Sequence, residues 1–197
     1  MIITVASFKG GVGKTTTAVH LAAYLQQRAP TLLLDGDDNR SALAWTARGG
    51  LPFMVADERQ AAKYARDYEH TVIDTEARPN DSDLRAVAGA CDLLVLPTTP
   101  DPLGLHALIQ TVRALDAAKA THYRVLLTIV PPRPSRDGDE AREFLKARKL
   151  PVFKGEIRRR VAYQKAVLAG VPVYDLSDPR AVAAWADYDR IGREIVK

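Results

Sequence analysis

The hydrophobic positions of the chain fall into short, nearly continuous runs that alternate with longer stretches of helical spacing. Apolar runs occupy residues 2–6, 31–34, 71–73, 93–96 and 125–130. A run without polar alternation is typical of a strand that is covered on both faces, as in a parallel sheet. We therefore predict a mostly parallel, twisted sheet.

Helical patterns lie between and after these runs. They cover residues 16–28, 41–48, 82–88, 105–118, 139–149, 162–169 and 181–196. In the first, Ala18, Leu21, Ala22 and Leu25 form one apolar stripe. In the last, we expect a stripe of Val182, Trp185, Tyr188 and Ile195 to pack into the core. The alternation predicts an α/β fold with helices on both faces of the sheet.

Size and composition fit one globular unit. The chain has 197 residues, of which 47% are apolar, so we expect a single domain over residues 1–197. Its single cysteine, Cys91, lies in an apolar stretch and excludes an internal disulfide. No targeting segment and no run of 18 apolar residues are present, so a soluble, cytoplasmic protein is expected.

The most specific motif directly follows the first strand. Residues 8–16 read FKGGVGKTT, and the ending Gly13-Lys14-Thr15 matches the phosphate-binding loop G-x-x-x-x-G-K-[ST]. The first glycine of that motif is replaced by Phe8, and a second cation, Lys9, follows it. A plain strand-to-helix turn is the alternative interpretation. The strand before the loop and the helix after it favour a phosphate site.

Carboxylates follow the next two predicted strands. Asp35, Asp37 and Asp38 come after the second strand, and Asp74 and Glu76 after the third. Ligands of open α/β sheets bind beyond the carboxyl ends of the strands, and Mg²⁺ prefers oxygen ligands. We interpret Asp37 and Asp74 as functional. Asp38 and Asn39 are assigned to the turn and helix start, where such residues are favoured.

The positive charge is concentrated in one segment. Residues 142–165 contain nine Lys or Arg and two Glu, a balance of +7, whereas the net charge of the chain is +4. Such a block is either a solvated face or a surface for an anionic partner.

Taken together, three motifs resemble one family. With Lys9 to Thr16, Asp35-x-Asp37 and Ile73-Asp74 in this order, the chain resembles the ParA/MinD deviant Walker-box ATPases. Residues 93–103 look like the strand and loop after the Walker B segment of small ParA-type partition proteins, and residues 159–166 are similar to their late basic helix. The resemblance covers nearly the whole chain. It implies a P-loop NTPase fold, the cofactors ATP and Mg²⁺, and a slow, adaptor-stimulated hydrolysis of ATP.

The resemblance also implies roles for individual residues. Lys9 would be the signature lysine, which reaches across a nucleotide-sandwich homodimer to phosphates held by the other subunit. Nucleotide binding is assigned to Lys9, Gly10, Gly11, Val12, Gly13, Lys14, Thr15 and Thr16. Lys14 would hold the β and γ phosphates, Thr15 would ligate Mg²⁺, and Thr16 would touch the α phosphate. Asp37 matches the water-orienting carboxylate, and Asp74 the acid that holds magnesium through its water shell. The catalytic set is thus Lys9, Lys14 and Asp37, and the metal set is Thr15, Asp37 and Asp74, with Asp35 in support.

Three departures from the family pattern are visible. Partition proteins commonly read Asp-x-Asp-Pro-Gln, whereas this chain has Asp38 and Asn39 after Asp37. Glu76 adds a carboxylate after Asp74, and we interpret it as a solvated loop charge that could instead help position water. Residues 131–134, PPRP, occupy the region where the family holds adenine, and they do not specify the base.

The leading functional hypothesis is a dimerising ATPase that binds DNA without sequence preference. Its cargo would be a plasmid, a chromosome region or a carboxysome-like body, recognised through a ParB-like or McdB-like adaptor on the nucleoid. The DNA-binding residues would be Arg158, Arg159, Arg160 and Lys165, with Lys154 as a further candidate.

Two alternatives come from other classes. A MinD-like membrane-cycling ATPase needs a C-terminal amphipathic anchor, but residues 187–197 mix acids with bases and read as the end of a folded helix, so no membrane partner is expected. A metabolic ligase needs a substrate pocket, which a compact chain of this length could hold, but Lys9 favours the dimer switch. An iron–sulfur reductase needs more cysteines than Cys91.

Overall fold

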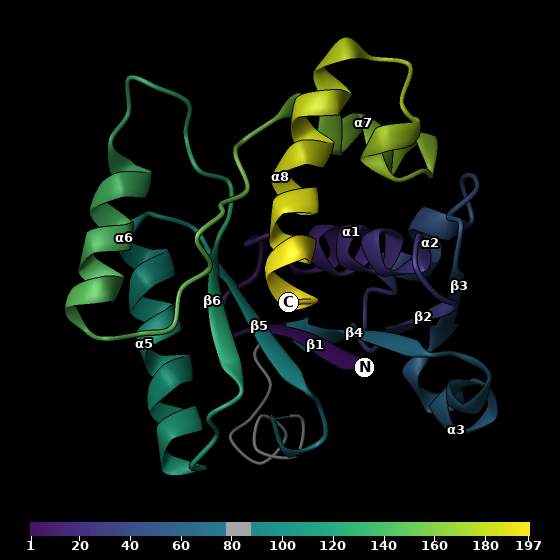
Figure 1. The fold of residues 1–197 in the computed structure, drawn as a ribbon, viewed down its shortest axis with the longest axis horizontal. Helices are drawn as coiled ribbons and strands as arrows, with labels where there is room; N and C mark the ends of the chain where they lie inside the picture. The colour runs from purple at the N-terminus through teal and green to yellow at the C-terminus, as the bar shows by residue number, and fades with distance from the viewer. Residues whose placement is uncertain (78–87) are drawn as a thin grey trace.

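A single sheet of six parallel strands organises the chain in the computed structural model, which describes residues 1–77 and 88–197 (Figure 1). The strand order is β3-β2-β4-β1-β5-β6. The strands are β1 (Ile2–Ser7), β2 (Thr31–Asp35), β3 (Met54–Asp57), β4 (His70–Ala77), β5 (Leu93–Thr98) and β6 (Tyr123–Leu127). The predicted α/β class and parallel sheet are confirmed.

Two details of the sheet differ from the sequence prediction. The short edge strand β3 was not predicted, because its four residues carry little pattern. The last predicted strand, 125–130, is too long, since β6 ends at Leu127. Beyond it the backbone turns at Ile129, whose φ is +52°, and Val130 forms an isolated bridge with Arg158.

The helices lie close to their predicted positions. They are α1 (Lys14–Gln26), α2 (Ser41–Thr46), α3 (Ala61–Tyr64), α5 (Pro102–Ala117), α6 (Asp137–Ala147), α7 (Val161–Ala169) and α8 (Pro179–Ile195). The one-turn helix α3 was not predicted. Residues 82–87 of the predicted helix over 82–88 lie outside the described part of the chain.

Both faces of the sheet are covered, which explains the continuous apolar runs. One face packs against α1, α2, α7 and α8, and there the core contains Ile3, Val5 and Leu33. On the other face α5 and α6 cover β5 and β6, while α3 lies over β2 and β3. Successive strand residues such as Leu94 and Val95 therefore point into different cores.

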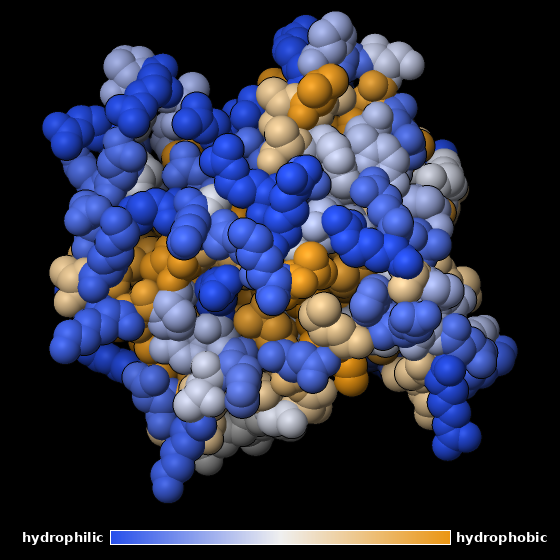
Figure 2. All heavy atoms as spheres, viewed as in Figure 1, coloured by the Kyte–Doolittle hydropathy of each residue, from blue (hydrophilic) through white to orange (hydrophobic). Residues whose placement is uncertain are grey.

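The stripe predicted for α8 is right at Tyr188, Trp185 and Ile195, which lie in the core or pack against it, and wrong at Val182. Val182 is 74% exposed, so its assignment to the core was wrong. The buried positions of α8 are Ala181, Ala184, Tyr188, Ile191 and Gly192. Figure 2 shows the outer sides of α5, α6 and α8 covered mainly by hydrophilic side chains, with hydrophobic atoms visible between α6 and α8. Among the described residues, no helix is both long and apolar enough to span a membrane.

Candidate nucleotide-binding site

The loop between β1 and α1 has the backbone of an anion site. Gly11 and Gly13 have φ values of +77° and +82°, in the left-handed region that glycine adopts without strain. Gly13 is the N-cap of α1, and none of the described side chains caps this helix end. The first amides of α1 are therefore available to phosphate oxygens, and the helix dipole favours negative charge there.

The two lysines of the loop differ in environment. Lys14 is only 7% exposed and starts α1, as expected of the lysine that holds phosphates. The side chain of Lys9 is 31% exposed, and its Nζ lies 3.1 Å from Oδ1 of Asp101. Lys14 is therefore buried at the start of α1, whereas Lys9 lies at the outer edge of the loop.

Asp74 is the strongest candidate for the metal site. It lies in the middle of the sheet, where β4 pairs Asp74 with Val5 of β1 and Asp35 of β2. Asp74 is fully buried, and neither carboxylate oxygen has a hydrogen-bond partner among the described residues. Burial raises the pKa of Asp74 to about 7, although the nearby Thr15 hydroxyl and Lys14 ammonium act in the opposite direction. A buried, unpartnered carboxylate near a phosphate loop fits Mg²⁺.

The described His, Cys, Asp and Glu side chains do not form a complete metal site by themselves. Among residues 1–77 and 88–197, no group of three or more His, Cys, Asp or Glu could hold an ion alone. This fits Mg²⁺ that is bound jointly by Thr15, Asp74 through water, and nucleotide phosphates. When bound, the ion would neutralise phosphate charge.

Asp35 and Asp37 have separate tasks in the turn after β2. Both carboxylate oxygens of Asp35 accept hydrogen bonds, Oδ1 from the backbone N–H of Asp37 (3.2 Å) and Oδ2 from that of Leu43 (2.9 Å). Asp35 therefore stabilises the turn, and its contribution to a metal site is secondary. Oδ1 of Asp37 accepts two bonds of 2.9 Å from Asn39, one from its backbone N–H and one from its side-chain amide. Asn39 therefore orients the carboxylate predicted to position water, a role that its assignment to the turn did not include.

The neighbouring acids Asp38 and Glu76 lie at the edge of this turn. Asp38 is exposed, which agrees with its assignment to the turn. Glu76 is half-buried near the end of β4, and its role in hydrolysis stays a prediction. Glu58, which follows β3, is close enough to feel the charge of Glu76. Burial raises the pKa of Glu58, the charges of Asp57 and Glu76 raise it further, and the charge of Arg40 lowers it.

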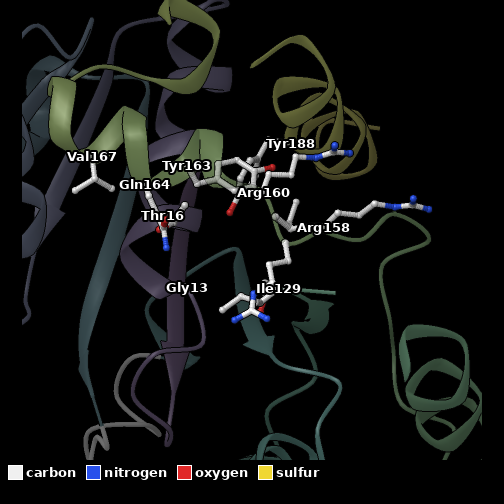
Figure 3. A pocket seen from close by; sticks show the side chains of 12 residues that line it. Gly13, Thr16, Ile129, Arg158, Arg160, Tyr163, Gln164, Val167 and Tyr188 are labelled. Atoms are coloured by element: carbon white, nitrogen blue, oxygen red, sulfur yellow. The ribbon is translucent and has the colours of Figure 1, made fainter. Parts of the chain in front are cut away.

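A cavity of about 260 Å³ opens beside the phosphate loop, and sequence reasoning missed it. In Figure 3, Gly13 and Thr16 come from the loop and α1, and Tyr163, Gln164 and Val167 come from α7. Ile129, Ile157 and Tyr188 complete the apolar part of its wall. Its position next to Thr16 suits the base and ribose of a nucleotide. Pro131 and Arg133, in the segment expected to hold adenine, line a separate hollow of about 40 Å³.

The predicted DNA-binding residues lie around this cavity. Arg158, Arg159 and Arg160 line it directly, and Lys165 follows on α7. Arg160 pairs with Asp187 at 2.8 Å and Lys165 with Asp178 at 2.8 Å, so acids at or within α8 neutralise part of the block. Arg158 lies 3.6 Å from Glu156. Arg159 and Lys154 are exposed and have no ion-pair partner in the described ranges.

Comparison with known proteins decides the family. A model described as the CobQ/CobB/MinD/ParA nucleotide binding domain matches residues 3–173. The chain belongs to this family. As a member of it, the chain is an ATPase, and its cofactors are ATP and Mg²⁺. One neighbour of similar fold, MinD from Aquifex aeolicus at 17% identity and a TM-score of 0.76, forms a complex with MinC.

Two relatives of this ParA/MinD family member are named "Maintenance of carboxysome distribution protein A". The protein from Gloeobacter kilaueensis is 39% identical over 201 residues, which cover 98% of this chain and 93% of that protein. The protein from Halothiobacillus neapolitanus is 27% identical over 207 residues, covering 98% and 95%. Apo McdA from Cyanothece matches the fold with a TM-score of 0.76 at 20% identity, covering 100% of this chain and 99% of that one.

Proposed function

We propose that this ATPase is a two-subunit switch on DNA, in which ATP joins two copies of the chain and hydrolysis separates them. The dimer binds DNA without sequence preference, and an adaptor protein links it to a cargo that it distributes over the nucleoid. The carboxysome-distribution relatives favour a protein body as the cargo and a McdB-like protein as the adaptor.

The observation that carries this proposal is the placement of the two loop lysines. Lys14 is enclosed at the start of α1, where a single subunit already supplies one cation to the phosphates. Lys9 is partly exposed at the rim and interacts with Asp101. A second cation outside the enclosed part of the loop is suited to phosphates on another subunit. Because a cation supplied in this way neutralises phosphate charge only when two subunits meet, ATP then stabilises the dimer.

The surface charge supports DNA binding, but fewer cations are free to contact DNA than the sequence predicts. Five of the nine cations in residues 142–165 form ion pairs within the described chain, and two of these pairs use acids outside the block, Asp178 and Asp187. Arg159 and Lys154 are the exposed cations among the predicted DNA contacts that have no such partner there. With roughly six phosphate contacts per dimer, affinity would fall about a thousandfold between 50 and 200 mM salt.

The central experiment compares wild type with Lys9→Ala. ATP affinity, ATP-dependent dimerisation and binding to random-sequence duplex DNA are measured at several salt concentrations. We expect Lys9→Ala to bind ATP but to lose dimerisation and DNA binding. Lys63→Ala, which removes an exposed lysine far from the loop in sequence, is the matched control and should behave as wild type.

Three outcomes contradict the proposal in different ways. Dimers that persist in Lys9→Ala would remove the role of Lys9 across the dimer. ATP-loaded wild type without salt-sensitive DNA binding would remove the nucleoid role, and flotation of that sample with liposomes would favour the membrane alternative. If cells that lack the gene keep their carboxysomes in place but lose a plasmid, the cargo is the plasmid and not a protein body.

A further inference from the structure

Lys9 interacts with a carboxylate of its own chain. Its Nζ lies 3.1 Å and 3.3 Å from the two oxygens of Asp101. The two residues are 92 positions apart, but β1 and β5 are adjacent parallel strands that pair Ile3 with Leu93 and Val5 with Val95. The loops that follow these two strands therefore meet, and Lys9 faces the residue before α5.

Asp101 keeps its position without help from Lys9. It is the N-cap of α5 and accepts a 2.9 Å hydrogen bond from the backbone N–H of Gly104. The hydroxyl of Thr99 donates a hydrogen bond to its other oxygen. A Cβ on Gly104 would collide with Thr99, so the helix start is closely packed there. Asp101 is thus held in place by its own helix start, whereas Lys9 contacts it through the end of a long, partly exposed side chain.

The carboxylate is charged throughout the range in which the protein would be studied. Partial burial acts to raise the pKa of Asp101, but the bonds from Thr99, Gly104 and Lys9 outweigh it and lower this pKa to about 2. The ion pair is partly exposed, with side-chain exposures of 31% for Lys9 and 45% for Asp101. A pair of this kind is weak enough to be replaced by a more highly charged phosphate group.

We propose that Asp101 holds Lys9 in an inhibitory ion pair within the free subunit, so that this pair opposes ATP-dependent dimerisation. The inference rests on the proposed role of Lys9 across the dimer. Lys9 must leave Asp101 to reach phosphates bound by a second copy of the chain, and a symmetric dimer breaks two such pairs. Asp101 is then a positioning residue that acts through Lys9 and sets the affinity between ATP-loaded subunits.

The test uses Asp101→Asn, which retains an oxygen for the Gly104 N–H but removes the charge that attracts Lys9. Asp178→Asn is a close control, because Asp178 is also a helix N-cap and also pairs with a lysine, Lys165 at 2.8 Å. The dissociation constant of the dimer is measured by sedimentation with Mg²⁺ and a slowly hydrolysed ATP analogue, without DNA. Thermal unfolding confirms that both variants fold.

We expect the Asp101→Asn dimer to dissociate with a constant about two- to thirtyfold lower than that of wild type, and Asp178→Asn to match wild type. In a Lys9→Ala background, which is expected to form no dimer, adding Asp101→Asn should not restore dimerisation. An unchanged constant would overturn the inhibitory role, and a higher constant would mean that Asp101 supports the dimer instead. If wild type itself forms no dimer with the analogue, the proposed function fails first and the inference with it.

Discussion

The imidazole ring of His20 contacts Thr16 beside the phosphate loop on one side and Val173 near the C-terminal helices on the other. Nδ1 of His20 lies 2.7 Å from the carbonyl oxygen of Thr16, and Nε2 lies 3.2 Å from the backbone N–H of Val173. Because the Val173 N–H can only donate, Nε2 accepts, and the proton of the neutral ring is on Nδ1. The ring is stacked on Tyr188 of α8 with 4.7 Å between centroids.

This arrangement predicts a pH-dependent stability. Burial lowers the pKa of His20 from 6.5 to about 4, although the bond to Thr16 acts to raise it. As pH falls, His20 therefore binds a proton in the unfolded chain at a higher pH than in the folded protein. The contribution of neutral His20 to the free energy of unfolding is present above about pH 6.5 and is lost between about pH 6.5 and 4. The full effect is about 3 kcal/mol.

The pH prediction is tested against His20→Phe, which keeps an aromatic ring but cannot titrate. We expect the free energy of unfolding of wild type minus that of the variant to fall by about 3 kcal/mol from pH 7 to pH 4. Other titrating groups, including Asp74, are present in both proteins and cancel. Urea unfolding across this range measures the difference, and a constant difference would contradict the assignment.

Asp74→Asn should make the nucleotide-free protein more stable and less active. Removing a buried, unpartnered carboxylate is expected to raise the free energy of unfolding of the nucleotide-free protein by about 1–3 kcal/mol at pH 8. The same change should lower Mg²⁺-dependent ATP hydrolysis by about 10- to 100-fold if Asp74 holds the metal through water, as proposed. The exposed Asp38→Asn is the control for both measurements. A variant that is less stable at pH 8 and fully active would refute this assignment.

Gly192→Ala is predicted to destabilise the protein although alanine favours helices. A Cβ at Gly192 of α8 would collide with the ring of Tyr24 on α1. We expect a loss of about 1–3 kcal/mol from this overpacking, measured by urea unfolding. Gly50→Ala, where a Cβ would meet no atom within 4 Å, should change stability by less than about 0.5 kcal/mol. Equal effects at the two sites would show that the contact is easily relieved.

Arg159→Ala distinguishes a DNA contact from a nucleotide contact. Arg159 is exposed, yet it also lines the cavity beside Thr16. As a phosphate contact in each subunit, its loss should lower the slope of log affinity for DNA against log salt by about two per dimer. ATP affinity should stay within about twofold, as in the control Lys63→Ala. A fall in ATP affinity with an unchanged salt slope would assign Arg159 to the nucleotide.

Much of the fold and of the nucleotide site can be predicted from the chain alone. The phosphate loop, the strand before it and the position of Asp74 depend on local features, namely continuous apolar runs, glycine backbone freedom and the residues at strand ends. The cavity wall could not be predicted in this way. Ile129, Ile157 and Tyr163 come together only after the chain passes from β6 to α7, and no local pattern marks them.

The sequence by itself determined the family, the parallel sheet and the presence of two lysines in one phosphate loop. Only the tertiary structure decided that Lys9 meets Asp101, that Asp178 and Asp187 neutralise part of the basic block, and that Val182 faces solvent. The physical reason is the range of the interactions. Backbone preference and hydrophobic periodicity act between near neighbours, whereas the partner of a charge depends on which distant loops the sheet brings together.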